Sequence, residues 1–242
     1  MWHDYIRTPF SALLSCQGRT RKVFENMKSI RQIFDHYAKD PMIRKKLITV
    51  LLAVIGMGIF VSILIEAAYG TDPCTFMNLS LSTKLQLSYG TWSVLINIVL
   101  LLIVFFSDPE KIGPGTLFNM ILIGYISDFC RYIWGKILPA DFFTNPATRI
   151  PVFLFGLLCF IFCAAVYMNA DMGVAPYDAL PLIAQKRFCP KFPFRFFRMA
   201  YDFLAILIGC LAGGRPGIGI ILMALLLGSA ITMVGKRMHS LG

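Results

Sequence analysis

The sequence has few charged residues. Of its 242 residues only 15% are Asp, Glu, Lys or Arg, whereas 57% are hydrophobic, and the mean hydropathy is +0.69. Soluble domains carry about a quarter charged residues, so too few polar groups are present to cover a soluble globule. The net charge of +10 does not indicate nucleic acid as a partner, because long uncharged stretches separate the basic residues. The composition predicts a membrane protein whose surroundings are the lipid bilayer.

Histidine is scarce, and no cysteine pattern is present. The three histidines, His3, His36 and His239, lie outside the long hydrophobic stretches, and the seven cysteines are scattered and odd in number. Neither a disulfide framework nor a zinc site is therefore expected. The glycine-rich segments near residues 113 and 215 lack the Lys-Ser/Thr that would complete a nucleotide-binding loop. These absences predict no metal, no cofactor and no catalytic residue, and they disfavour a membrane-embedded enzyme.

The most prominent feature of the sequence is a series of long uncharged stretches. A helix needs about 20 mostly apolar residues to cross a bilayer, and six stretches reach this length or approach it. The two shorter ones do so only by taking in Asp128 and Asp202, and a carboxylate inside a membrane usually faces the interior of a helix bundle. The sequence predicts an all-α fold with six transmembrane helices. The stretches are 47–65, 85–107, 112–127, 150–170, 199–214 and 216–235.

The basic residues predict the orientation of these spans, because Lys and Arg concentrate in cytoplasmic loops. Ten precede the first span, and threading six spans from there places 18 of the 23 on that side. Both termini are therefore expected in the cytoplasm. Within residues 1–46, apolar side chains recur every three or four positions between 23 and 37, which is typical of an amphipathic helix on an anionic membrane surface. A disordered basic tail is the alternative.

Two halves of the chain repeat one another. Gly70-Thr-Asp-Pro73 and Gly173-Val-Ala-Pro176 are 103 residues apart, the glycines of 113–115 and 217–219 are 104 apart, and Asn97 falls on Asp202. The units, 47–137 and 148–238, contain three predicted spans each. Because three is odd, the second unit starts from the opposite side of the membrane, an arrangement common in secondary transporters. Chance similarity between glycines in apolar sequence is the alternative.

The second Gly-x-x-Pro segment carries a family resemblance. Val166-Tyr-Met-Asn-Ala-Asp-Met-Gly-Val-Ala-Pro-Tyr-Asp-Ala-Leu180, followed by the glycines of 214–219 and Gly228, resembles the YczE/YyaS/YitT-like bacterial integral membrane proteins, particularly the YczE branch. The resemblance spans about 47–235 and implies a bacterial inner-membrane protein with repeated Gly-x-x-Pro segments and no firmly assigned activity. The first copy departs from the pattern around Asp72 and Cys74, which argues against a symmetric site.

Both Gly-x-x-Pro segments suggest interrupted helices. Gly70 and Gly173 permit unusual backbone angles, and Pro73 and Pro176 suit the first turn of a new helix. Irregular backbone at membrane depth is tolerated only where protein or a cavity covers it. Two re-entrant or discontinuous segments are therefore expected, approaching the membrane centre from opposite faces. An ordinary turn that begins with proline is the alternative.

Polar residues within or near the spans are the candidate site. Asp128 and Arg131 are three residues apart and are expected to pair on one helix face. Glu66 and Asp202 have no such partner in the prediction, so either can couple transport to protons, pair elsewhere, or lie at the interface. The amides can bind substrate or join helices. The candidates are Glu66, Asp72, Asn97, Asp128, Asn169, Asp171, Asp178 and Asp202.

These patterns favour a small secondary transporter or permease with its site between the repeats. The excess of acidic groups in the spans indicates a cationic or amine-bearing small molecule, or coupling to protons. The alternative is a non-transporting anchor or regulator that binds a cytosolic protein through residues 1–46 and the basic aromatic segment 186–198. Association into a homo-oligomer is compatible with either function.

Overall fold

The computed structural model describes residues 23–32, 35, 41–139, 141–188, 190–191, 194–223 and 233–234, and all regular secondary structure in this part of the chain is helical. An all-α fold is therefore confirmed for it. From α2 to α8 the helices, in chain order, are α2 (Ile43–Ala67), α3 (Pro73–Leu85), α4 (Tyr89–Ser107), the short 3-10 helix η1 (Pro109–Lys111), α5 (Pro114–Ile137), α6 (Pro146–Met168), α7 (Pro176–Phe188) and α8 (Phe194–Leu211).

Three of these helices, α2, α4 and α6, are long and apolar enough to cross a membrane. They correspond to the first, second and fourth predicted spans. The third corresponds to α5, which runs ten residues beyond the predicted end at 127. The fifth corresponds to α8. Residues 224–232 and 235 of the sixth lie outside the described part of the chain, so a six-span architecture stays a prediction.

Both Gly-x-x-Pro segments interrupt the helical path, and a short helix follows each. The first interruption starts at Ala68, whose φ of 52° ends α2. Gly70 and Gly173 have φ values of 114° and 93°, which favour glycine. The helices that follow, α3 and α7, each have 13 residues. At 1.5 Å per residue each is about 20 Å long, too short to cross a hydrocarbon core of about 30 Å.

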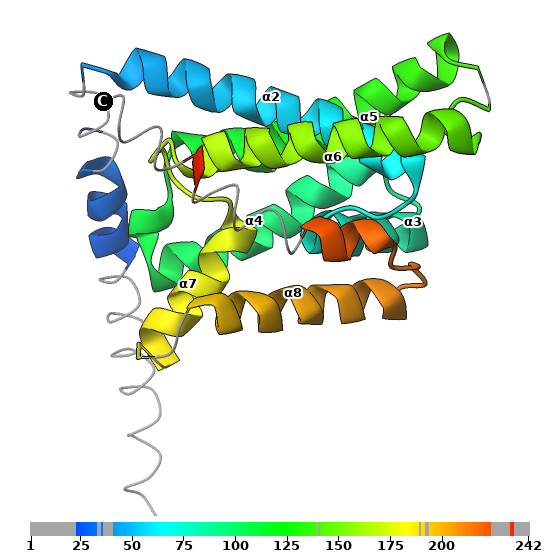
Figure 1. Cartoon of the computed structure of the whole chain (residues 1–242). Coiled ribbons are helices and arrows are strands. Elements are labelled where there is room, and N and C mark those ends of the chain that lie inside the picture. Colours follow the sequence, from blue (N-terminus) through cyan, green and yellow to red (C-terminus); the bar gives the residue numbers. More distant parts are fainter. Residues whose placement is uncertain are drawn as a thin grey trace, which may run out of the picture.

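The main hydrophobic core lies where α2 packs against α5 and α6. Val54, Leu64, Leu157 and Tyr167 are almost completely buried in it. On the other side of the molecule α3 packs on α8, and α4 packs on α7 as well as on α5. Figure 1 shows α2 and α8 on opposite sides of the bundle. The short helix of each half thus packs on a long helix of the other half.

Glycines of each half also hold the helix interruption of the other half. The Gly115 amide donates to the Met172 carbonyl at 2.7 Å, and the Gly219 amide donates to the Tyr69 carbonyl at 2.8 Å. Gly115 and Gly219 are 104 residues apart, and Tyr69 and Met172 are 103 apart. The two contacts therefore join residues that the predicted repeat aligns with each other.

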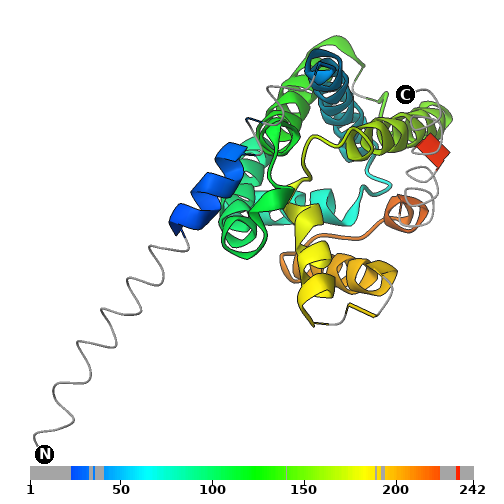
Figure 2. The same cartoon turned by 90° about the vertical axis from the view of Figure 1, so that its left-hand side faces the viewer.

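Residues 23–32 form a helix on the outside of the bundle (Figure 2). Asn26 donates from Nδ2 to the Phe105 carbonyl of α4 at 2.7 Å, and Ile30 packs against the buried cluster of Val104, Ile112 and Ala179. Most of the rest of the predicted amphipathic segment, residues 1–22, 33–34 and 36–40, lies outside the described residues.

Candidate functional site

A cavity of about 400 Å³ opens between the two halves of the molecule. Its walls include the first turns of both short helices, α3 and α7, together with side chains of α2, α4, α5, α6 and α8. The lining residues are Met57, Asp72, Pro73, Cys74, Thr75, Asn78, Tyr89, Ser93, Asn97, Asn119, Ile123, Phe160, Ala164, Tyr167, Met168, Ala175, Tyr177, Asp178, Arg198, Met199, Asp202 and Met223.

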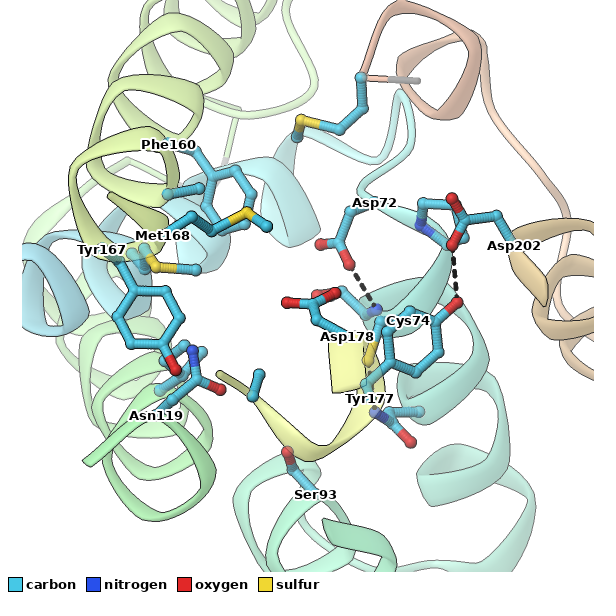
Figure 3. A pocket seen from close by; sticks show the side chains of 18 of the residues that line it. Asp72, Cys74, Ser93, Asn119, Phe160, Tyr167, Met168, Tyr177, Asp178 and Asp202 are labelled. Carbon is cyan, nitrogen blue, oxygen red and sulfur yellow. Dashed lines mark hydrogen bonds between the residues drawn. The ribbon is translucent and has the colours of Figure 1, made fainter. Parts of the chain in front are cut away.

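One wall of the cavity is acidic. Asp72 precedes α3, Asp178 lies in the first turn of α7, and Asp202 lies on α8. Figure 3 shows these three carboxylates on one side of the cavity, facing α6. Arg198 is the one Lys or Arg among the lining residues. With all four groups ionised, the wall carries a formal charge of −2.

Arg198 holds two of the three carboxylates. Its Nε donates to Asp202 Oδ2 at 3.0 Å, and its Nη1 donates to Asp178 Oδ1. The Tyr177 hydroxyl donates to the other oxygen of Asp202 at 2.9 Å (Figure 3). Charge-assisted hydrogen bonds of this kind are about twice as strong as neutral ones. The network fixes α8 to the first turn of α7.

Asp72 has a different environment. Its Oδ2 accepts from the Thr75 amide at 3.0 Å and thereby caps α3, where the positive end of the helix dipole favours a carboxylate. Its Oδ1 is buried and has no hydrogen-bond partner among the described residues. The start of α3 is therefore occupied by an anionic group of the protein itself, and one acceptor atom of that group is left over.

Amides and hydroxyls of α3 and α4 continue this polar wall. Asn78 is 2% exposed, and its Oδ1 has no hydrogen-bond partner in the described part of the chain. Asn97 donates to the Ser93 carbonyl at 2.8 Å, and the hydroxyls of Thr75 and Tyr89 are 3.4 Å apart. A buried acceptor without a partner costs about 1–3 kcal/mol. A ligand that donates a hydrogen bond to Asn78 Oδ1 would therefore remove this cost and gain binding free energy.

The opposite wall is mostly apolar. Phe160, Tyr167 and Met168 of α6 face the acidic wall across the cavity (Figure 3), and Met57 of α2 adds to the same surface. A mostly apolar lining with a few convergent polar groups is typical of small-molecule sites. The arrangement can hold the apolar body of a ligand on one side and its charged or polar group on the other.

The structure brings some of the predicted site residues to the cavity and not others. Asp72, Asn97, Asp178 and Asp202 line it, as does Pro73. The other candidates are absent from its lining; they are Glu66, Gly70, Asp128, Asn169, Asp171, Gly173 and Pro176.

Glu66 and Asp128 belong to an ion-pair cluster away from the cavity. Arg131 donates from Nε to Glu66 Oε1 at 2.7 Å, whereas its Nη1 lies 3.9 Å from Asp128 Oδ1. Asp128 accepts a further hydrogen bond from the Gly90 amide at 2.7 Å. The expectation that Arg131 neutralises Asp128 within one helix is thus incomplete, because the shorter contact joins α5 to the end of α2.

The expectation that Asp202 has no basic partner at helical spacing is wrong. Arg198 precedes it by four residues on α8 and pairs with it, which is a standard contact on one helix face. That spacing is visible in the sequence. Asn78 and Tyr177 are not among the predicted site residues, because an amide or a phenol on a short helix gives no local signal of a binding role.

Asn169 and Asp171 shape the end of α6. Asn169 is the C-cap residue, and it donates from Nδ2 to the Ala165 carbonyl at 2.8 Å. Asp171 has a φ of 52°, in the left-handed region. Both residues precede Gly173 in the interruption before α7, so their position is structural rather than part of the cavity wall.

Known proteins similar to this chain are membrane or uncharacterised proteins. The family of unknown function DUF6198 matches residues 44–236. The uncharacterised membrane protein YczE of Bacillus subtilis is 30% identical over 180 residues, which cover 73% of this chain and 78% of YczE. An uncharacterised protein of Haemophilus influenzae is 28% identical over 77% of this chain and 82% of its own length. The uncharacterised protein YyaS of Bacillus subtilis is 26% identical over 71% of this chain and 83% of its own length.

No solved structure matches the chain significantly. The similarity to the membrane protein YczE agrees with the apolar helices α2, α4 and α6 in indicating a membrane protein.

Proposed function

The chain belongs to DUF6198, a family of unknown function, and from this premise we propose that it is a small secondary transporter whose substrate site is the cavity between its two halves. The observation that carries the proposal is the position of this cavity at the start of both short helices, α3 and α7. In transporters with inverted repeats, substrate sites lie near the membrane centre, where discontinuous helices begin.

The packing of the short helices supports a site that can open to either side. Because α3 packs on α8 and α7 packs on α4, each short helix is attached to a long helix of the other half. A rocking motion of one half against the other would open the cavity to one side of the membrane and close it to the other, which is the basis of alternating access.

The charge of the cavity supports a cationic substrate. Asp72, Asp178 and Asp202 oppose the single charge of Arg198, and a bound cation offsets part of the remaining negative charge. An anion would meet this charge and would also find the start of α3 already capped by Asp72.

A transport assay tests this function. In proteoliposomes at mildly acidic pH, we expect saturable, protein-dependent uptake of radiolabelled phenethylamine or tetraethylammonium. Asp72→Asn is expected to reduce uptake at least about tenfold, since a charge-assisted contact contributes about 1.5–3 kcal/mol. Asp141→Asn, which changes an exposed carboxylate outside the cavity, is the matched control and should retain uptake. Wild-type protein that takes up neither probe faster than protein-free liposomes would overturn the proposal.

We further propose that the protein lies in a bacterial plasma membrane as two inverted three-helix units with both termini in the cytoplasm. The distribution of basic residues supports this orientation, because 18 of the 23 fall on the proposed cytoplasmic side. The reciprocal amide contacts of Gly115 and Gly219 support a duplicated arrangement.

Cysteine labelling tests the orientation. Asp141 and Arg187 are exposed and lie on opposite sides in the proposed topology. In a cysteine-free background, Asp141→Cys should react with a membrane-impermeant maleimide added to spheroplasts, whereas Arg187→Cys should react only in inverted vesicles. Labelling of both positions from one side would contradict the inverted arrangement, and the unmodified background shows the level of unspecific reaction.

A further inference from the structure

We infer that the cavity binds a protonated primary amine with a small apolar or aromatic body, whose ammonium group lies between Asp72 and Asn78. The inference rests on the proposed function in that it names the substrate class of the same cavity. Binding of such a ligand is nevertheless measurable without transport.

Two buried acceptor atoms define the position of the ammonium group. Asp72 Oδ1 and Asn78 Oδ1 both lack a hydrogen-bond partner among the described residues, and both side chains line the cavity from α3. A primary ammonium group has three N–H donors and no acceptor. Such a group in the cavity can therefore donate to these acceptors and neutralise the charge of Asp72. The Tyr89 hydroxyl also lines the cavity, 3.4 Å from the Thr75 hydroxyl, and its oxygen can accept from the third donor while its own proton goes to Thr75.

The other two carboxylates are less suited to hold the ligand. Asp178 and Asp202 already accept hydrogen bonds from Arg198, and Asp202 also accepts one from Tyr177. A ligand that bound them would have to displace the Arg198 side chain, which is only 23% exposed. Their charge still favours a cation at Asp72, because it acts across the same cavity.

The apolar wall determines the rest of the ligand. Phe160, Tyr167 and Met168 lie across from Asp72 (Figure 3), where an aliphatic or aromatic group can be buried at about 25 cal/mol per Å². The volume of about 400 Å³ is at the lower end of the usual range for small-molecule sites. A quaternary ammonium ion lacks the N–H donors that the two acceptors need. A hydrated metal ion would lose water against the apolar wall.

Calorimetric titration of the purified full chain tests the inference. Phenethylamine is expected to bind at least about tenfold more tightly than its neutral analogue 2-phenylethanol and than its N,N,N-trimethyl derivative. Asp72→Asn is expected to weaken the binding of phenethylamine at least about tenfold. Asp141→Asn, which changes an exposed carboxylate outside the cavity, should bind like the wild type. Equal affinity for phenethylamine and 2-phenylethanol would overturn the inference.

Asn78→Leu separates ligand binding from a structural role of the amide. Leucine is close to asparagine in size and leaves no acceptor without a partner, so the melting temperature of the variant should equal or exceed that of the wild type. Its affinity for phenethylamine should nevertheless fall at least about tenfold. A large loss of stability with unchanged affinity would show that the amide serves the fold and would contradict the proposed contact.

The binding and transport results are distinguishable. Binding of phenethylamine that depends on Asp72, without protein-dependent uptake, would retain the ligand class and overturn the transporter. Saturable uptake of tetraethylammonium by protein that does not bind phenethylamine would retain the transporter and overturn the ligand class.

Discussion

Alanine at Gly173 or at Gly217 is expected to prevent the two halves of the molecule from packing together. A Cβ atom at Gly173 would lie 2.5 Å from the Gly113 amide nitrogen, and one at Gly217 would lie 2.0 Å from the Tyr69 carbonyl oxygen. These neighbours are backbone atoms, which cannot turn away as a flexible side chain can. Each substitution must therefore shift one helix interruption away from the other half.

The cost is expected to be larger at Gly173. At either glycine, overpacking lowers the free energy of unfolding by about 1–3 kcal/mol. At Gly173 the φ of 93° lowers it by about 1–2 kcal/mol more, because a residue with a Cβ atom is strained in this conformation. A loss of this size is a large fraction of the stability of a typical domain. Either variant should give little monodisperse protein in detergent, and any that is obtained should melt at a markedly lower temperature.

Gly135→Ala is the matched control. A Cβ atom at this position would meet no atom within 4 Å, and Gly135 lies inside α5, where alanine is favoured over glycine by up to about 1 kcal/mol. The control should therefore melt at or slightly above the wild-type temperature. A Gly173→Ala protein that melts like Gly135→Ala would show that the close approach of the two backbones contributes little to the fold.

The helices and their interruptions could be predicted from the sequence because both have local causes. Apolar stretches of sufficient length predict α2, α4 and α6. Glycine followed three residues later by proline predicts the breaks before α3 and α7, because glycine permits positive φ and proline suits the first helical turn. Both effects act within a few residues, so neighbouring structure does not override them.

The ion pairs and the cavity wall could be predicted only in part. The contact of Arg131 with Glu66 joins residues 65 apart in sequence and depends on how α2 packs against α5. The Arg198–Asp202 pair follows from its spacing of four residues, whereas Asp178 enters that network only through the packing of α7 on α8. Asn78 gives no local signal, since a polar residue on a short helix is compatible with exposure to solvent.

Replacing Arg198 by glutamine is expected to have the largest effect of any charge change in the cavity. The guanidinium group holds both Asp178 and Asp202, whose side chains are 19% exposed. Removing one partner of a buried ion pair costs about 3–5 kcal/mol because the remaining charge is uncompensated. Since these groups are partly exposed, we expect a loss of about 2–4 kcal/mol, measured as a lower melting temperature of the purified protein.

A second substitution shows whether charge is the cause. Asp202→Asn in the Arg198→Gln background removes one of the two carboxylates that have lost the guanidinium group. The double variant should therefore melt at a higher temperature than Arg198→Gln alone. A double-mutant cycle measures the coupling between the two substitutions. Lys186→Gln is the control for the loss of a cation. Its partner is Asp108, and because the Lys186 side chain is 72% exposed, the change should cost less than about 1 kcal/mol. Additive effects of the two cavity substitutions would contradict the role of Arg198 as the counter-charge of the acidic wall, because the loss would then come from packing of the long side chain alone.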